Sequence, residues 1–485
     1  MIKNDERNIT KKKIEIINYG IPFIFAFILM MCYLWKQDSM ILSSGDANDI
    51  WHTIITMDTE NVYGSYVLYK GFGSVYPYYW FYKLAQFLDI NDFFFVKVYH
   101  SILFGYIAAI GLPNCIELIS KSKTRWWRRI TLVVFLFWMW KGIAIFEQMI
   151  IDLPSCAFFV LYINAVLKLL RNRNVKWYNI LWTGLLLGIN LCMSGQYTLP
   201  AVIIVFYLIC KTLSINIKEK NQKSIFRSII CVCVIIGCGC MVRGYNTYFE
   251  KSMVEPLREE GAWIPSGQQW IQSGLLRFMP VQRKLMGAQI NDNRGLQIVE
   301  DYYGTDNQEF IDKALIGNSA ITYGDYFKIV FKYPGDFVIK YCNRLFLALS
   351  PDGGFFSFHR LFIIWSLIFV ALLTVWRNCR TWKSVFSDGT VVVLAFFSAV
   401  IPLMVLNVEV RCAIQIQGLV MATAITHNYF WDALNRLKVN ICQRKFATEV
   451  PYIVVIYFFF MIFCFIHMGS LYDTVEGTYS ILMNW

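Results

Sequence analysis

Two carboxylates stand three residues apart just after the first strongly apolar run of the chain. The stretch ILSSGDANDIWHTIITMDTENVYGSYVLYKGFGSVYPYYWFYKL, residues 41–84, carries Asp46 and Asp49 and follows the run YGIPFIFAFILMMCYLW. On a helix, residues three apart share a face, and like charges there repel unless a cation, a metal ion or a proton-accepting role uses them. A single helix N-cap would need only one such residue. The pair therefore predicts a general base, because a positioned Asp can take a proton from a hydroxyl.

The elements that position these acids are predicted to be membrane helices. The chain has 485 residues, of which 57% are hydrophobic and only 16% are charged, whereas a soluble domain carries about 25% charged residues. Several windows of about 18 or more residues have almost no charge, which is the length needed to cross a bilayer. The apolar runs predict eleven spans, at about 17–36, 94–113, 130–146, 153–169, 177–194, 197–213, 228–243, 360–376, 390–408, 412–431 and 450–468.

The net charge of +12 is a topology signal and not a sign of nucleic-acid binding. When the gaps between spans alternate between inside and outside, the basic clusters all fall on one side, at residues 11–13, 121–129, 171–176, 218–227, 377–383 and 436–445. The positive-inside rule makes that side cytoplasmic. We therefore expect a multi-pass protein of the cell membrane with a cytoplasmic N-terminus and no cleaved signal peptide.

The same alternation divides the chain into three parts. Residues 1–243 form a transmembrane module whose first outer loop spans 37–93, residues 244–359 form a large outer loop, and residues 360–485 hold the C-terminal helices. Short interfacial helices are expected in the large loop at about 306–316, 322–332 and 335–349. The inner loops are short and lack a glycine-rich phosphate cradle. Any chemistry is therefore expected at the outer face.

The cysteine-rich run CVCVIIGCGC has two interpretations. It places Cys231, Cys233, Cys238 and Cys240 in one predicted helix. A metal site would need these side chains on one face, and their spacing puts them on different faces. Small, soft residues in a helix-packing face are the favoured interpretation.

The order of motifs in the first outer loop resembles the GT-C superfamily of integral membrane glycosyltransferases, which includes the protein O-mannosyltransferases and the lipid A aminoarabinose transferase. In that family a catalytic Asp in the first outer loop precedes a segment similar to PPLYYWL, and here residues 76–80 read YPYYW. The stretch LDINDFFFVKVYHSIL then resembles the start of the family's second helix, with Lys97 where an Arg is usual. The resemblance implies an all-α, GT-C-like bundle.

Two later stretches extend the resemblance. FEQMIIDLPSCAFFVLYINAVL is similar to the family's short second acidic turn and supplies Glu147 and Asp152. NVEVRCAIQI resembles the family's ERYLLP stretch and supplies Glu409 and Arg411. Together the likeness covers roughly residues 15–210 and, more loosely, 330–430, and the large outer loop 244–359 has no counterpart.

The resemblance implies a polyprenyl-phosphate sugar as donor, a hydroxyl on a glycan, lipid or protein as acceptor, and inversion at the anomeric carbon. Asp46, which follows Gly45, is the favoured base, and Asp49 would hold the acceptor or a metal ion. A departing phosphate gains negative charge, which Arg or Lys side chains stabilise. Candidates for the phosphate are Lys70, Arg344, His359 and Arg411, and candidates for the acceptor or sugar are Glu147, Asp152, Tyr78 and Trp80. The sequence requires no cofactor, and the Asp46/Asp49 pair permits a divalent metal.

Two other classes stay open. A transporter or flippase for lipid-linked sugars would need ionisable groups inside the membrane, and the spans are nearly free of acids. An O-antigen-type polymerase or ligase would place its chemistry in a late outer loop, for which 244–359 is available. That alternative leaves the early acidic loop unexplained.

Overall fold

The structure is a computed structural model, and all regular secondary structure in its described part is helical. It describes residues 15–42, 45–57, 73, 75–120, 123–143, 145–171, 176–219, 222–249, 251–252, 271, 275, 297–298, 301–302, 322–350, 358–379, 388–405, 410–427, 431 and 449–482. The chain divides into two compact units. Unit 1 comprises Met1–Ile264, Asn378–Ala399 and Ile414–His427, and unit 2 comprises Pro265–Arg377, Val400–Ala413 and Asn428–Trp485.

Within the described ranges, five helical segments are long and apolar enough to cross a membrane. They are Ile16–Leu34, Phe94–Ser120, Asp152–Arg171, Phe358–Trp376 and Tyr452–Gly469. These five agree with predicted spans, so a helical membrane protein is confirmed at this level. Shorter apolar helices cover Trp177–Met193, Gly195–Lys211, Ile229–Tyr245 and Asp388–Ser398. The full count of eleven spans stays a prediction.

The predicted span 390–408 is not one continuous helix. Helix α21 (Asp388–Ser398) ends before a turn at residues 399–400, and the five-residue helix α22 (Ile401–Val405) follows. Pro402 has no N–H to continue the hydrogen-bond ladder of the preceding helix, which explains a break at this point. The two halves belong to different units.

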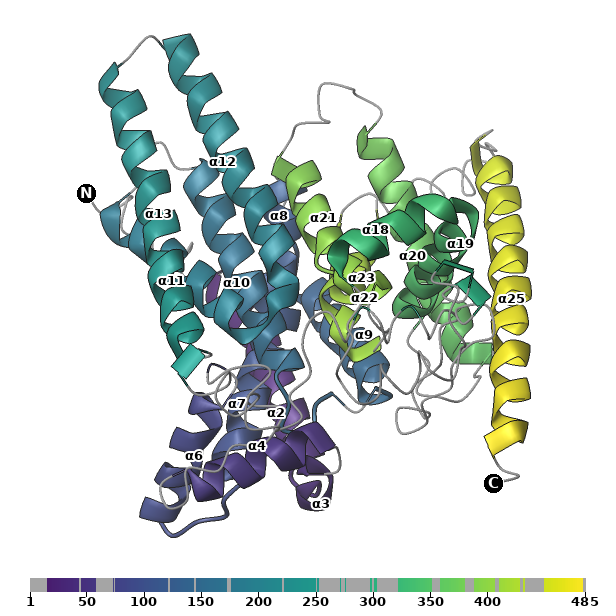
Figure 1. Ribbon diagram of the computed structural model, residues 1–485, viewed down its shortest axis with the longest axis horizontal. Coiled ribbons are helices and arrows are strands. Elements are labelled where there is room, and N and C mark those ends of the chain that lie inside the picture. The colour runs from purple at the N-terminus through teal and green to yellow at the C-terminus, as the bar shows by residue number, and fades with distance from the viewer. Residues whose placement is uncertain are drawn as a thin grey trace. The chain divides into compact units, whose positions relative to one another are not determined.

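Unit 1 contains most of the described helices, labelled in Figure 1 where there is room. In chain order they are η1 (Ile16–Gly20), α2 (Ile21–Leu34), α3 (Asp38–Ile41), α4 (Gly45–Thr56), α6 (Tyr76–Phe87), α7 (Phe94–Gly105), η3 (Tyr106–Gly111), α8 (Leu112–Ser120), α9 (Trp126–Lys141), α10 (Asp152–Arg171), α11 (Trp177–Met193), η4 (Gly195–Tyr197), α12 (Thr198–Glu219), α13 (Gln222–Phe249), α21 and α23 (Ile414–Thr426). Both η1 and η3 are π-helical turns that continue directly into α2 and α8.

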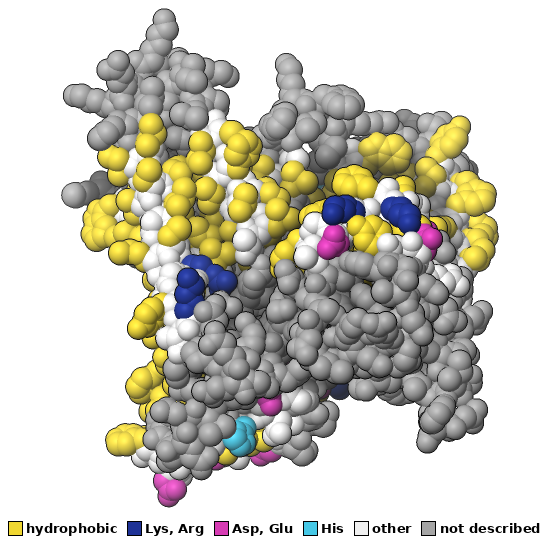
Figure 2. Space-filling view, in the orientation of Figure 1, with side chains coloured by type: hydrophobic (Ala, Val, Ile, Leu, Met, Phe, Trp, Pro, Cys, Tyr) yellow, Lys and Arg dark blue, Asp and Glu magenta, His cyan; other side chains and the backbone are white. Residues whose placement is uncertain are grey.

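Helices α11 and α13 pack closely because glycines line their contact. A Cβ added at Gly184 would lie 2.7 Å from Cβ of Cys238, and one at Gly188 would lie 2.6 Å from Cβ of Val242. Small residues let membrane helices approach in this way. The packing interpretation of the cysteine-rich run is therefore confirmed for Cys238. Figure 2 shows hydrophobic side chains over α12 and α13, as expected for helices that face lipid. Phe206 of α12 and Met241 of α13 are among the exposed hydrophobic residues.

A buried ion pair joins α8 to α9 at their predicted cytoplasmic ends. Arg129, fully buried, donates from Nη2 to Oε1 of Glu117 at 2.6 Å and from Nη1 to the carbonyl of Ala109 at 2.7 Å. Its guanidinium also lies over the ring of Tyr19, 4.2 Å from the centroid. The sequence predicted only a topology signal from this basic loop. The structure adds a structural role for Arg129, because a buried guanidinium needs these partners.

Unit 2 is built around two consecutive helices, α18 (Tyr323–Lys332) and α19 (Pro334–Leu349). Thr322 caps α18 by accepting the backbone N–H of Asp325 at 3.1 Å, and Pro334 starts α19 at a position where no helical N–H is required. Both helices agree with the predicted segments 322–332 and 335–349. The third predicted segment, 306–316, lies outside the described residues. The other described helices of this unit are α20 (Phe358–Cys379), α22, η8 (Val410–Ala413) and α25 (Glu449–Leu482).

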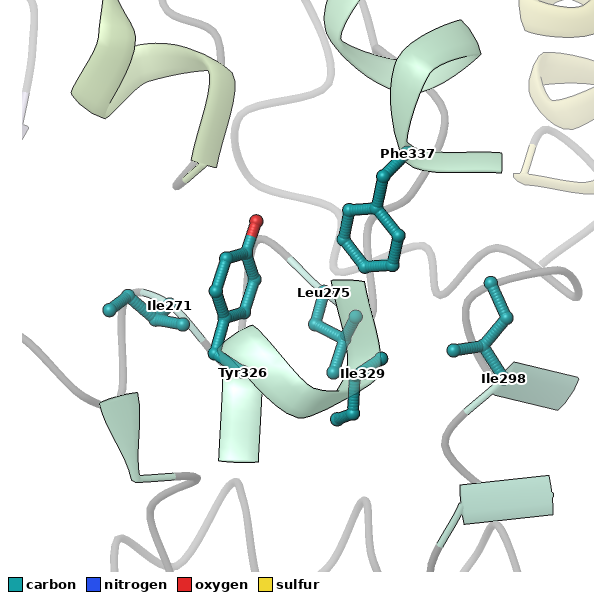
Figure 3. Close-up of a cluster of buried hydrophobic side chains, with 6 residues drawn as sticks. All are labelled: Ile271, Leu275, Ile298, Tyr326, Ile329 and Phe337. Carbon is teal, nitrogen blue, oxygen red and sulfur yellow. The ribbon is translucent and has the colours of Figure 1, made fainter. Parts of the chain in front are cut away.

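A small hydrophobic core holds α18 and α19 together. Figure 3 shows Tyr326 and Ile329 of α18 with Phe337 of α19, accompanied by Ile271, Leu275 and Ile298. The hydroxyls of Tyr326 and Tyr341 lie 2.7 Å apart at the edge of this core. The core fixes the orientation of α19, which carries one of the predicted phosphate ligands.

Candidate functional site

The two acids of the first outer loop lie on α4. Asp46 and Asp49 are both partly exposed, whereas Ala47 and Ile50 on the inward face are fully buried. Helix α4 packs on α6, where Trp51 meets Tyr82 edge to face with ring centroids 5.3 Å apart. The amphipathic pattern of α4 thus leaves the acids partly open to solvent while its apolar face anchors them.

A second acidic segment, residues 145–151, connects α9 to α10, and we call it the outer turn after the side predicted for it. The backbone N–H of Met149 donates to the carbonyl of Ile41 at 3.0 Å. The hydroxyl of Tyr78 donates to the carbonyl of Ile150, also at 3.0 Å. Ile41 and Tyr78 both belong to the first outer loop. The outer turn is therefore hydrogen-bonded to the same loop that carries the Asp pair.

His100 of α7 completes this attachment. Its Nδ1 lies 2.8 Å from the carbonyl of Phe146, and its Nε2 lies 2.9 Å from the hydroxyl of Tyr78. A carbonyl only accepts, so Nδ1 carries the proton of the neutral ring. Nε2 and the carbonyl of Ile150 are then both acceptors facing the single O–H proton of Tyr78, which they share. The imidazole therefore bridges α6, α7 and the outer turn within a fully buried environment.

Glu147 of the outer turn is a buried carboxyl. Its Oε1 accepts a 3.0 Å hydrogen bond from the hydroxyl of Tyr33, and its Oε2 has no hydrogen-bond partner among the described residues. Burial raises the pKa of Glu147 above its ordinary value, although the hydrogen bond from Tyr33 and the charge of Lys141 oppose that rise. The raised pKa means that this carboxyl takes up a proton more readily than a free one, and its protonated form can donate a hydrogen bond as well as accept one.

Asp152 begins α10 directly after the outer turn. Ser155 donates to its backbone carbonyl at 3.0 Å, and this bond tightens the first turn of the helix. Burial, together with the charges of Tyr99 and Asp152, raises the pKa of Tyr78 well above that of a free tyrosine. The carboxylate of Asp152 thus lies within electrostatic range of the hydroxyl that anchors the outer turn. Its separation from Asp46 and Asp49, expected below about 15 Å if they share a site, stays a prediction.

The two aromatic candidates of the YPYYW segment differ in their surroundings. Tyr78 is only 1% exposed, and its hydroxyl is engaged with Ile150 and His100, which gives it a positioning role. Trp80 is 64% exposed on the same helix. Of the two, Trp80 is the side chain that can contact a ligand directly.

Sequence reasoning assigned no role to His100 or Tyr33. A histidine inside an apolar span is itself a signal, because ionisable residues are rare there and mark sites or networks. Tyr33 lies near the C-terminal end of α2 and carries no such signal.

The predicted phosphate ligands that the structure describes all belong to unit 2. Arg344 on α19 is 1% exposed and donates from Nη1 to the carbonyl of Met404 at 2.7 Å. Lys340, one turn earlier, is also fully buried, so α19 carries two cations on one face. Arg411 lies in η8, which packs against α19.

His359 and Lys70 complete the predicted set of phosphate ligands. His359 is exposed in the first turn of α20, where its ring meets Phe358 edge to face with centroids 6.0 Å apart. Lys70 lies outside the described residues. Among the described residues, no group of three or more His, Cys, Asp or Glu side chains could hold a metal ion.

No protein-family model and no curated protein matches this chain.

Proposed function

We propose that this protein is a membrane glycosyltransferase that moves a sugar from a polyprenyl-phosphate donor to a hydroxyl of a cell-envelope glycan, lipid or protein. The observation that carries the proposal is the connection between two acidic segments of unit 1. Asp46 and Asp49 lie on α4, and the outer turn, which contains Glu147 and precedes Asp152, is hydrogen-bonded to Ile41 and Tyr78 of the same loop. This arrangement supports acid–base chemistry and agrees with the resemblance to GT-C enzymes.

The proposed reaction is an inverting displacement. The acceptor hydroxyl oxygen attacks the anomeric carbon and forms the new glycosidic bond, while the bond from that carbon to the phosphate oxygen breaks. The polyprenyl phosphate leaves with the electron pair, and the hydroxyl proton passes to a carboxylate of the pair. Asp46 is favoured because of Gly45 beside it. Apart from its chain neighbours and its own helix backbone, no heavy atom of the described residues lies within 4 Å of where a Cβ would stand at Gly45, which leaves this backbone open to a ligand.

The other unit 1 candidates orient the reactants in this proposal. Asp49 and Asp152 accept hydrogen bonds from the acceptor hydroxyls, and Glu147, whose Oε2 has no hydrogen-bond partner among the described residues, accepts one from a sugar hydroxyl. Trp80 offers an exposed aromatic face to the prenyl chain or sugar. A metal ion at the Asp46/Asp49 pair is compatible with the proposal and is not required by it.

Basic side chains are assigned to the leaving phosphate for electrostatic reasons. Preorganised Arg or Lys donors stabilise the charge that develops on a departing phosphate. The candidates stay Lys70, Arg344, His359 and Arg411. Each is tested by its own substitution, for which the proposal expects a higher KM for the donor or a lower kcat.

The decisive experiment measures sugar transfer by purified protein in proteoliposomes with a polyprenyl-phosphate sugar and a hydroxyl acceptor. Asp46→Asn and Asp49→Asn keep shape and hydrogen bonding but remove proton acceptance, so the base variant should lose about 10²–10⁴-fold in rate. Asp89→Asn is the matched control, since Asp89 is an exposed acid of the same loop with φ 52°, a conformation that Asn also adopts.

If both Asn variants keep near-normal transfer, the base lies elsewhere and the assignment is wrong. If the wild-type protein moves the lipid-linked sugar across the bilayer and releases no glycosylated acceptor, the transporter alternative replaces the transferase. If the protein only joins repeating units to one another, the polymerase alternative replaces the transferase.

The proposed orientation has its own test. The positive-inside rule places the N-terminus in the cytoplasm and the acidic segments outside. A reporter fused after Trp485 should read as extracytoplasmic, and one inserted between Lys218 and Arg227 should read as cytoplasmic. A cytoplasmic reading after Trp485 would contradict the count of eleven spans.

A further inference from the structure

Unit 1 contains a cavity that the proposed reaction does not use. Its volume is about 310 Å³, and it lies among η3, α8, α10 and α11. Apolar side chains form part of its wall. The polar residues that line it are Tyr106, Asn114, Asn164, Lys168, Asn179 and Thr183.

Asn164 is the residue that points to a ligand. It is 3% exposed, and its Nδ2 donates to the carbonyls of Gly111 at 2.9 Å and Val160 at 3.0 Å. Those two acceptors fix the orientation of the amide, because the opposite orientation would set oxygen against oxygen. Oδ1 is therefore the unused acceptor of this lining residue: it has no hydrogen-bond partner among the described residues and almost no accessible surface, so a donor in the cavity reaches it after a small shift of the side chain. A buried acceptor of this kind calls for an O–H or N–H donor.

The backbone beside the cavity is built around this amide. The π-helical turn η3 ends at Gly111, where an added Cβ would lie 2.6 Å from Cγ1 of Val160. Only glycine therefore lets η3 and α10 approach closely enough for Asn164 to reach the carbonyl of residue 111. Single π-helical turns inside α-helices frequently mark functional sites.

Lys168 supplies a positive charge next to the amide. It lies four residues after Asn164 on α10, so both side chains share one face of the helix and line the same cavity. Along α10, Asn164 lies about 18 Å and Lys168 about 24 Å from Asp152 at the predicted outer end. In a hydrocarbon core about 30 Å thick, the cavity therefore belongs to the cytoplasmic leaflet, with Lys168 nearer the headgroups.

The cavity also reaches the lipid-facing surface. Trp182 lines it and is 47% exposed. Tryptophan is enriched at the level of the lipid headgroups. An occupant can therefore enter from the bilayer with its chain still in lipid.

We propose that this cavity binds a lysophospholipid of the cytoplasmic leaflet. The order of the binding groups along α10 selects this class. The phosphate pairs with the ammonium of Lys168, the free glycerol hydroxyl donates to Oδ1 of Asn164 about 6 Å deeper, and the acyl chain follows the apolar wall. In a lysophospholipid the hydroxyl stands between the phosphate and the acyl chain, which is the same order. A headgroup hydroxyl, as in phosphatidylglycerol, stands on the water side of the phosphate and does not match.

The test is native mass spectrometry of the purified chain titrated with three probes: 1-oleoyl lysophosphatidic acid, its 2-O-methyl ether and glycerol 3-phosphate. The methyl ether keeps the size and charge of the ligand and removes the donor to Asn164. We expect it to bind about threefold to tenfold more weakly than the lysolipid, as expected for one lost hydrogen bond. Glycerol 3-phosphate, which has the phosphate and hydroxyls but no chain, should show no binding at the same concentrations.

A pair of lysine variants separates this site from general attraction to anionic lipid. Lys168→Gln should weaken lysolipid binding by about tenfold or more, since a charge-assisted bond is lost. Lys176→Gln is the control, because Lys176 is a basic residue at the start of α11, at the same predicted face, and does not line the cavity. Three results would each overturn the proposal and leave a water-filled cavity. They are equal binding of the lysolipid and its methyl ether, equal effects of the two lysine variants, and no binding of the lysolipid at all.

Discussion

Tyr33 and Glu147, 114 residues apart in the chain, are joined by a 3.0 Å hydrogen bond between the end of the first span and the outer turn. The tyrosine O–H donates and the carboxyl Oε1 accepts. The ammonium of Lys141 lies over the same tyrosine ring, 5.0 Å from its centroid. This contact fixes the buried acid of the outer turn against α2.

The raised pKa of Glu147 makes stability depend on pH in a defined direction. A carboxyl whose pKa in the folded state exceeds its unfolded value, about 4.3, binds more protons in the folded state. Its contribution to the free energy of unfolding is therefore complete at low pH and is lost as the pH rises through the folded pKa. Glu147→Gln removes the titrating group and should flatten this fall. The check is the melting temperature in detergent between pH 5 and pH 8, with Glu15→Gln, an exposed acid, as control. An unchanged pH profile in Glu147→Gln would contradict the prediction.

Gly184 should be intolerant of even one added methyl group. Gly184→Ala places its Cβ 2.7 Å from Cβ of Cys238 and 3.1 Å from the backbone of Ile235, so α11 and α13 must separate. Overpacking of this kind costs about 1–3 kcal/mol. Gly237→Ala on α13 is the matched control, since nothing lies within 4 Å of its added Cβ. Thermal unfolding of both variants compares them, and equal stabilities would show that the helices do not pack as described.

Lys97 should tolerate arginine and not methionine. Its buried ammonium forms an ion pair with Asp38 and donates to the carbonyl of Trp35 at 3.3 Å, which ties α7 to the start of the first outer loop. Lys97→Met removes both bonds and leaves the carbonyl without its donor, at a cost of about 1–3 kcal/mol.

Arginine can keep both of these bonds, because it also carries a positive charge and several N–H donors. The measurement is limited proteolysis of the first outer loop, together with the melting temperature. Similar protection in Lys97→Met and wild type would mean that the ion pair does not anchor the loop.

The long apolar helices could be predicted from the sequence because each is set by a local pattern. Hydropathy alone was enough to predict the span around Asp152–Arg171. The cap of α18 and the proline that starts α19 are equally local signals. The interruption at residues 399–400 was missed, although Pro402 gives a local reason for it. The apolar composition of that stretch continues across the proline, so hydropathy alone predicts a single helix.

The contacts that build the site could not be predicted in the same way. The acids were identified from their types and spacing, but Tyr33 with Glu147, and His100 with Phe146, are pairs between segments far apart in the chain. Nothing local specifies such pairs. Arg129 was counted among loop charges, and only its position next to Glu117 reveals a buried ion pair.

Tyr78→Phe tests whether the outer turn must be held in place for activity. The variant keeps the ring, which meets Tyr99 and His100 edge to face, and removes only the hydroxyl. The carbonyl of Ile150 then loses its donor and Nε2 of His100 loses its partner in a fully buried place, at a cost of about 1–3 kcal/mol.

Because Tyr78 does not reach the surface, Tyr78→Phe should lower kcat for sugar transfer more than it raises KM for the acceptor, while the protein stays folded in membranes. Tyr82→Phe, on the same helix, retains its ring contact with Trp51 and should leave kcat unchanged. Transfer rates with varied acceptor concentration separate the two effects. A higher KM with unchanged kcat would mean that Tyr78 contacts the acceptor itself, and normal values for both would mean that the outer turn does not need this anchor.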